Sequence, residues 1–287
     1  MISALVSAAV TIYLGFLLLL YAVQRRIVFK PDTTPADLAA VGLAGQMREV
    51  AITTTDGLTL TSWWAPPVRP DRRVIVYFHG NAGHRGGRAD RIRDYLAAGY
   101  GVLLVGYRGY GGNPGRPTEA GLYADARANL AFLAHQNVRP AEIVLFGESL
   151  GTAVAIQMAT ETPVLALVLE APIASITLSA RARYPLFTFD FLVRDKFNSV
   201  KKIGKVTVPL LLVHGEQDRT TAVRFGRMVY NAANAPKHAH FIAEAGHNDL
   251  MEHGLAKAVT EFLDGLPAGD QPARAAFSAA PAMLDIT

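Results

Sequence analysis

The sequence predicts an α/β protein in which a mostly parallel central sheet carries helices on both faces, preceded by one N-terminal membrane helix. Two observations indicate the sheet: short apolar runs alternate with helix-like stretches, and an initial strand pair flanks a tight turn. A third observation indicates the membrane helix, because the chain begins with a long uncharged apolar segment. Hydrophobic residues make up 51% of the 287 residues, which is enough for a large core.

The composition excludes several kinds of site. The chain contains no cysteine, which rules out disulfides, thiolate metal sites and a cysteine nucleophile. The net charge of +4 comes with no recognition motif, so we expect no nucleic-acid partner. The same mild charge suits either a solvated surface or attraction to anionic lipid.

The first element is a membrane anchor formed by residues 1–30. Residues 2–23 carry no charge and are long enough to cross about 30 Å of hydrocarbon as a helix. Arg25, Arg26 and Lys30 follow this segment, whereas a cleaved signal peptide has its basic residues in front and a small-x-small site behind. We therefore expect a retained single-pass anchor, with the main domain on the cytoplasmic side because the positive charges follow the span.

Residues 31–265 form the predicted catalytic domain, entered through a linker or short helix. Alternating residues on both sides of Asp56-Gly57 indicate a β-hairpin. Apolar runs typical of strands buried on both faces follow at residues 74–78, 102–105, 143–146, 164–169, 210–213 and 239–242. Helix-like stretches lie between them at residues 90–98, 118–134, 150–160 and 222–232, the second with Thr118 as its N-cap.

Two segments depart from this alternation. Residues 172–208 are long and rich in aromatic side chains, and they form either a lid over the strand ends or a longer helical crossover. Residues 266–287 are rich in alanine, proline and glycine and show little periodicity, so we expect a mobile tail.

A nucleophile motif stands between a strand and a helix. Residues 147–151 read Gly-Glu-Ser-Leu-Gly and match the G-x-S-x-G elbow. A sharp strand-to-helix corner crowds its neighbours, which explains a glycine on each side, and it raises the hydroxyl of Ser149 above the sheet. The corner also places the backbone N–H of Leu150 at a helix N-terminus, where developing negative charge is stabilised. We therefore expect Ser149 to be a nucleophile and Leu150 to be an oxyanion donor.

A serine nucleophile needs a base and an acid that orients the base. His247 follows the last expected strand and is the candidate base. Asp218 follows the preceding strand and is the preferred acid, which gives the chain order Ser, Asp, His of the α/β-hydrolases. Glu170, at the end of the strand after the elbow, is the alternative acid. His214, at a strand end, is interpreted as a packed structural histidine.

The second oxyanion donor is expected in the loop after the first buried strand, which reads His-Gly-Asn-Ala-Gly over residues 79–83. The backbone N–H of Asn81 is the first choice and that of Ala82 the second. A phosphate cradle is disfavoured because no G-K-[S/T] follows. No metal-ligand spacing is present among the histidines.

These motifs together resemble the Bem46-like α/β-hydrolases, a group that includes membrane-anchored hydrolases related to the ABHD13 and ABHD17 proteins. The resemblance extends over roughly residues 48–264 and rests on the motifs at 79–83, 147–151, 214–218 and 246–249, with two more at 107–111 and 115–119. It implies an α/β-hydrolase fold, a triad of Ser149, Asp218 and His247, and no cofactor. ABHD17-type members remove acyl groups from lipidated proteins.

The sequence departs from the family pattern in two places. Thr152 stands where the group usually has a glycine after the elbow, and residues 219–221, Arg-Thr-Thr, replace a hydrophobic-proline pair after the acid. The second departure leaves the local geometry of Asp218 open.

The sequence therefore predicts a membrane-anchored serine hydrolase that cleaves acyl esters or thioesters through an acyl-enzyme. The expected partners are an acyl substrate, either a lipid or a lipidated protein, and the membrane. Two alternatives stay open: a serine peptidase of aminopeptidase type, and a non-catalytic member of the fold, since fold alone does not guarantee activity.

Overall fold

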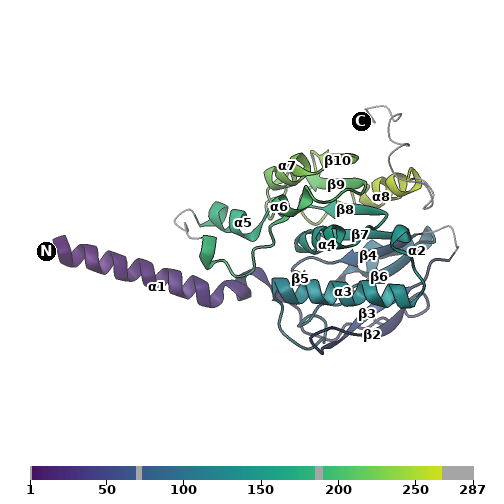
Figure 1. The fold of residues 1–287 in the computed structure, drawn as a ribbon, viewed down its shortest axis with the longest axis horizontal. Helices are drawn as coiled ribbons and strands as arrows, with labels where there is room; N and C mark the ends of the chain where they lie inside the picture. The colour runs from purple at the N-terminus through teal and green to yellow at the C-terminus, as the bar shows by residue number, and fades with distance from the viewer. Residues whose placement is uncertain (1, 69–72, 185–189, 267–287) are drawn as a thin grey trace.

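The computed structural model describes residues 2–68, 73–184 and 190–266. Its centre is an eight-stranded sheet in the order β10-β9-β8-β7-β4-β6-β3-β2 (Figure 1). The strands are β2 (Arg48–Thr53), β3 (Thr59–Ala65), β4 (Val74–Phe78), β6 (Gly101–Leu104), β7 (Ile143–Glu148), β8 (Ala166–Glu170), β9 (Leu210–Gly215) and β10 (Lys237–Ile242). Only the pairs β2–β3 and β3–β6 are antiparallel, so the predicted mostly parallel sheet is confirmed.

The β2–β3 hairpin turns where the sequence indicates. Gly57 adopts a φ of +86°, a conformation that glycine reaches without strain. The N–H of Thr54 donates to the carbonyl of Leu58 at 2.8 Å and closes the turn. This hairpin forms one edge of the sheet, and the parallel strand β10 forms the other.

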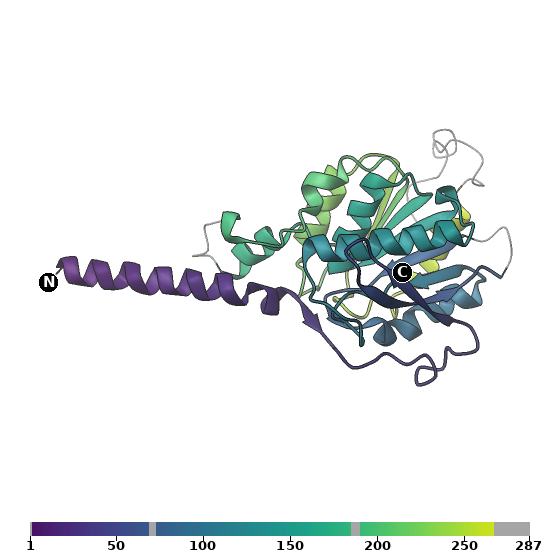
Figure 2. The same ribbon diagram turned by 60° about the horizontal axis from the view of Figure 1, so that its bottom comes forward.

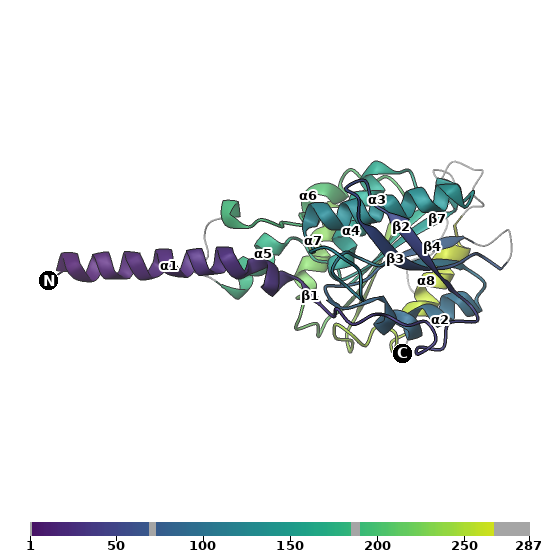
Figure 3. The ribbon, with the colours of Figure 1, turned by 90° about the horizontal axis from the view of Figure 1, so that it is seen from below.

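Helices cover both faces of the sheet, and Figure 3 shows the two layers. The helices α3 (Glu119–His135), α4 (Leu150–Glu161), α6 (Ser199–Ile203) and α7 (Val223–Ala232) lie on one face, and α2 (Ala89–Ala97) and α8 (Leu255–Asp264) on the other. Alternate side chains of β4 divide between two cores: Val76 faces α3 and α4, and Ile75 faces α2 and α8. Helix α8 was not predicted.

The side chain of Thr118 caps α3 as expected, accepting from the N–H of Gly121 at 2.9 Å. A side-chain cap such as Thr118 fixes where its helix begins and therefore the direction of the preceding loop. Two short 3₁₀ helices, η1 (Arg85–Arg88) and η2 (Pro140–Glu142), precede α2 and β7.

Helix α1 (Ile2–Val28) projects from the domain as a rod in both Figure 1 and Figure 2. It is long and apolar enough to cross a membrane, and its 27 residues correspond to about 40 Å at 1.5 Å per residue. Large apolar side chains along it are exposed, among them Leu5 (66%), Val10 (51%) and Leu18 (70%). The helix continues past the expected end at Val23, because its last turns have partners in the domain.

The interval 172–208 contains both a crossover helix and a part that leaves the helix layer. Helix α6 packs against α4 and α7 and belongs to the crossover between β8 and β9. Helix α5 (Ile176–Arg183) and the 3₁₀ helix η3 (Asp190–Leu192) leave this layer and lie beside the end of α1 (Figure 1). The Oγ of Ser175 caps α5 by accepting from the N–H of Leu178 at 3.1 Å.

The segment between α1 and the central sheet holds an unpredicted strand. Strand β1 (Lys30–Pro31) pairs in parallel with β5 (Ala82–Gly83), and turns rather than a helix lead on to β2. At the other end of the chain, Leu266 is buried and the rest of the expected mobile tail, 267–287, lies outside the described residues.

Candidate active site

Four loops meet at the carboxyl edge of the sheet. Strands β4, β7, β9 and β10 run parallel, so the loops that follow them emerge at the same edge. The structure brings Ser149, Asp218 and His247 together there. The Nε2 of His247 lies 3.2 Å from the Oγ of Ser149, and its Nδ1 lies 2.6 Å from the Oδ2 of Asp218. These are the distances of a nucleophile–base–acid relay.

Ser149 is held in a strained backbone conformation. Its φ is +50°, which is uncommon for a residue with a side chain and is typical of a functional corner. The N–H of Ser149 donates to the carbonyl of Glu170 at 2.8 Å, and the hydroxyl of Thr152 donates to the carbonyl of Ser149 at 2.5 Å. Thr152, the first departure from the family pattern, therefore fastens the corner.

The glycines beside the serine are required by space. A Cβ at Gly151 would lie 2.0 Å from the carbonyl oxygen of Phe78 at the end of β4. A Cβ at Gly147 would lie 2.5 Å from the Cα of Thr152. Because no side chain fits at either position, the helix can start close against the sheet and present its N-terminal N–H groups to the site.

Asp218 is buried and surrounded by donors. Its Oδ2 accepts from His247 and also from the Nε2 of His214 at 3.1 Å. The N–H groups of Thr220 and Thr221 donate to its Oδ1 at 2.8 and 2.7 Å. Burial alone would raise the pKa of Asp218, but the hydrogen bonds from His214 and His247 hold that pKa well below its ordinary value. The carboxylate is therefore ionised near neutral pH.

The structure shows what the second departure from the family pattern, Arg-Thr-Thr at residues 219–221, does at the site. A proline after the acid would have no N–H, whereas both threonines donate to Asp218. His214 is the site residue whose role sequence reasoning missed. It is buried as expected, yet its imidazole holds the acid, and its place four residues before Asp218 was the available signal.

The alternative acid Glu170 is engaged elsewhere. Its Oε1 forms an ion pair with Arg91 at 2.5 Å, and beside it Glu148 forms one with Arg88 at 2.6 Å. The hydroxyl of Tyr77 also donates to Glu148 at 3.0 Å. Burial raises the pKa of Glu170 despite Arg91, whereas Arg88 lowers the pKa of Glu148 against the effect of burial. This cluster of two arginines and two glutamates was not predicted from the sequence.

The two arginines of this cluster also donate to the backbone of two loops of the site. Arg88 also donates to the carbonyl of Ala82 at 2.9 Å, and Arg91 donates to the carbonyl of Asn248 at 3.0 Å. A cavity of about 360 Å³ lies beside it, lined by Ala82, Gly83, Gly87, Arg88, Arg91, Glu148 and Asn248. Two of the lining residues, Glu148 and Asn248, are the chain neighbours of Ser149 and His247.

The loop at residues 79–83 lies directly against the elbow. A Cβ at Gly80 would lie 3.4 Å from the Cβ of Ser149. Within the described chain, neither the N–H of Asn81 nor that of Leu150 donates a hydrogen bond to the protein. His79 anchors the loop: its Nδ1 lies 2.8 Å from the carbonyl of Gly80, and burial lowers its pKa to about 3, so the ring is neutral.

Asn81 is also bonded to the end of helix α1 and to the residues that follow it. Its Nδ2 donates to the carbonyl of Val28 at 2.7 Å. Its carbonyl accepts from the N–H of Lys30 and from the hydroxyl of Tyr110, both at 3.1 Å. The position of this loop therefore depends on the last residue of α1 and on the residues directly after it.

Replacing Asn81 by alanine tests this dependence. We expect kcat for an ester to fall about fivefold with little change in KM, because one neutral hydrogen bond of about 1 kcal/mol steadies a donor used in the transition state. Steady-state kinetics on the full chain in detergent measure it. Asn234→Ala is the control, since its amide also donates to backbone carbonyls, of Gly204 and Val206. Equal losses in both variants would contradict the expectation.

No group of three or more histidine, aspartate or glutamate side chains in the described ranges could hold a metal ion.

The chain is similar to several known proteins. A family model described as serine aminopeptidase, S33, matches residues 69–202. Protein Rv2307c of Mycobacterium tuberculosis is 36% identical over 254 residues, which cover 87% of this chain and 90% of that protein. Human α/β-hydrolase domain-containing protein 17B is 30% identical over 63% of this chain and 62% of its own length.

Two further comparisons concern activity and fold. The lysophosphatidylserine lipase ABHD12 of Danio rerio is 31% identical over 61% of this chain, which spans about half (51%) of that protein. The esterase Pf2001 of Pyrococcus furiosus has a similar structure, with a TM-score of 0.67 at 20% identity, covering 83% of this chain and 97% of that one. The second match bears on the fold alone.

Proposed function

Because the chain belongs to the Bem46-like α/β-hydrolases, an esterase- and lipase-like family, we propose that it is a membrane-anchored serine hydrolase of acyl esters or thioesters. One observation supports the proposal above all others. The imidazole of His247 lies within 3.2 Å of the Ser149 hydroxyl and 2.6 Å of the Asp218 carboxylate, beside two backbone N–H groups. That arrangement is suited to acyl transfer.

The mechanism has two halves. The Oγ of Ser149 attacks the acyl carbonyl carbon while the Nε2 of His247 takes its proton, and Asp218 stabilises the imidazolium. The oxyanion accepts hydrogen bonds from the N–H groups of Asn81 and Leu150, each lowering the barrier by roughly 3 kcal/mol. Collapse breaks the bond to the leaving alcohol or thiol, which receives the proton from His247. Water, deprotonated by the same imidazole, then hydrolyses the acyl-enzyme.

The domain organisation follows from the same proposal. Residues 1–30 would anchor the enzyme in the membrane and residues 31–265 would carry the chemistry. Arg25, Arg26 and Lys30 after the span favour a cytoplasmic domain, and Arg25 also pairs with Asp195 of the domain at 2.7 Å. A membrane lipid ester or a lipidated protein would then be the substrate. The name of the relative ABHD12, a lysophosphatidylserine lipase, favours a lipid.

A peptidase is the second candidate, because the matching family model is described as a serine aminopeptidase. A panel of p-nitrophenyl esters and aminoacyl-p-nitroanilides separates the two. With the full chain in detergent micelles, we expect turnover of esters and little turnover of anilides. A higher kcat/KM for the anilides would establish the peptidase instead, and failure of every substrate would favour a non-catalytic protein.

A further inference from the structure

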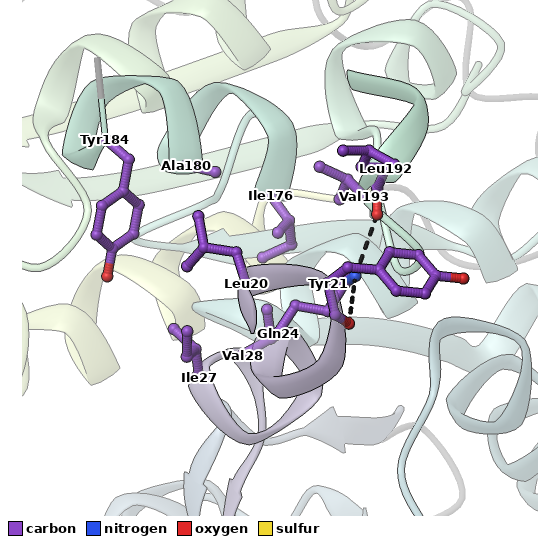
Figure 4. Close-up of a pocket in the computed structure, with 10 residues that line it drawn as sticks. All are labelled: Leu20, Tyr21, Gln24, Ile27, Val28, Ile176, Ala180, Tyr184, Leu192 and Val193. Carbon is purple, nitrogen blue, oxygen red and sulfur yellow. Dashed lines mark hydrogen bonds between the residues drawn. The ribbon is translucent and has the colours of Figure 1, made fainter. Parts of the chain in front are cut away.

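A second pocket lies away from the triad, where the membrane helix meets the domain. Its first wall is the end of α1, and its second wall is α5 with the residues around η3 (Figure 4). Its volume is about 70 Å³, and it is lined by Leu20, Tyr21, Gln24, Ile27, Val28, Ile176, Ala180, Tyr184, Leu192 and Val193. None of these ten residues is charged.

The polar side chain of Gln24 is fully occupied and leaves the pocket apolar. Its Nε2 donates to the carbonyls of Leu192 at 3.1 Å and Tyr21 at 3.0 Å, and its Oε1 accepts from the N–H of Arg194 at 2.8 Å. Figure 4 shows Leu20 directed toward α5, between these bonded groups and Ala180. The rest of the lining is aliphatic apart from the tyrosines Tyr21 and Tyr184, which suits an alkyl chain.

The pocket begins where hydrocarbon would end. Leu20 and Tyr21 belong to the last part of the uncharged span, whereas Ile27 and Val28 lie beyond the first basic residues. The preceding turns of α1 expose their apolar side chains, as a lipid-facing helix does. An acyl chain could therefore pass from the bilayer into this pocket without crossing water.

Each wall of the pocket is joined, by a hydrogen bond or along the chain, to a segment that contacts the elbow of Ser149. Val28 lines the pocket, and its carbonyl accepts from Asn81 of the oxyanion loop at 2.7 Å. On the other wall, α5 begins six residues after Glu170, the last residue of β8, whose carbonyl accepts from the N–H of Ser149. Both walls of the pocket are therefore joined to segments that contact the serine corner.

We propose that this pocket binds the acyl chain of the substrate, so that the membrane helix forms part of the specificity site as well as the anchor. The proposal rests on the proposed acyl hydrolysis and adds its substrate class: a long-chain acyl ester or thioester taken from the bilayer. Helix α1 then selects chain length, and the triad cleaves whatever acyl group reaches it.

The test is the chain-length dependence of the full-length protein in detergent, with p-nitrophenyl esters from acetate to palmitate. Ala180→Trp fills the pocket, and we expect kcat/KM for palmitate to fall at least about tenfold, the effect of losing about two buried methylene groups. Acetate should change less than about twofold, since it does not reach the pocket. Ala131→Trp, on the exposed face of α3, is the matched control and should change neither ester.

Two results would overturn the acyl pocket: an unchanged ratio of palmitate to acetate turnover in Ala180→Trp, or an equal fall for both esters. If that variant does not fold, Leu20→Ala decides, since enlarging the pocket should raise the preferred chain length and an unchanged preference rejects it. Absence of turnover of every ester in the series by the wild type would instead reject the proposed hydrolase. A diazirine-bearing hexadecanoic acid gives a readout without catalysis: crosslinks within 20–28, 176–184 or 190–193 support the pocket, and crosslinks elsewhere alone reject it.

Discussion

Replacing Ser149 by alanine is expected to lower kcat for an ester by roughly 10⁶-fold, because it removes the attacking oxygen and not merely a contact. The same change should abolish covalent labelling by a fluorophosphonate, which reacts with an activated serine. Stopped-time hydrolysis assays and labelling of the full chain measure both effects. The thermal unfolding midpoint should stay the same, because the hydroxyl makes one contact, at 3.2 Å to His247.

Ser62 provides the matched control for this change. It is a buried serine whose hydroxyl donates to Asn129 at 2.8 Å and accepts from the N–H of Gly106 at 2.9 Å. Ser62→Ala should lower the unfolding midpoint and leave labelling intact. Labelling that survives Ser149→Ala would identify a different nucleophile and remove the basis of the proposed function.

Replacing Asp218 by asparagine is expected to lower kcat by roughly 10⁴-fold. The amide oxygen can still accept from the N–H groups of Thr220 and Thr221, which turns the NH₂ toward His247. The imidazole must then present a lone pair at Nδ1 and a proton at Nε2, so it cannot deprotonate Ser149. Kinetics with the fold checked by circular dichroism measure the loss.

Glu170→Gln is the comparison that this prediction needs. Glu170 is equally buried, but it pairs with Arg91 and not with His247. We expect the substitution to destabilise the protein, since a buried arginine loses its charge partner, while kcat changes far less than in Asp218→Asn. The opposite order of the two effects would make Glu170 the acid.

Much of the fold could be predicted because its signals are local. The apolar run at 74–78 is β4 without any shift, and the strand-to-helix change at residues 148–150 places the elbow correctly. Helix α8 escaped prediction, although its apolar residues Leu255, Val259 and Leu263 are buried at helical spacing. The pairing of β1 with β5 could not be predicted, because two-residue strands carry no periodicity.

The site, like the fold, could be predicted only in part. Ser149 and His247 were chosen from motifs and chain order, and the structure places them in contact. The choice between Asp218 and Glu170 could not be made from residue type, because both follow buried strands and both are carboxylates. It depends on which loop reaches the imidazole. The ion pairs of Arg88 with Glu148 and of Arg91 with Glu170 could not be predicted either, because the paired residues are far apart in the chain.

By itself, the sequence determined the main strands and most helices, their order, the nucleophile corner and the apolar length of the N-terminal helix, because each depends on neighbouring residues and their period. Only the tertiary structure decided which carboxylate holds the imidazole and that the end of α1 is bonded to Asn81. Those contacts join segments that the sheet and its crossovers bring to one edge. Their geometry follows from packing across the whole domain, which no local pattern encodes.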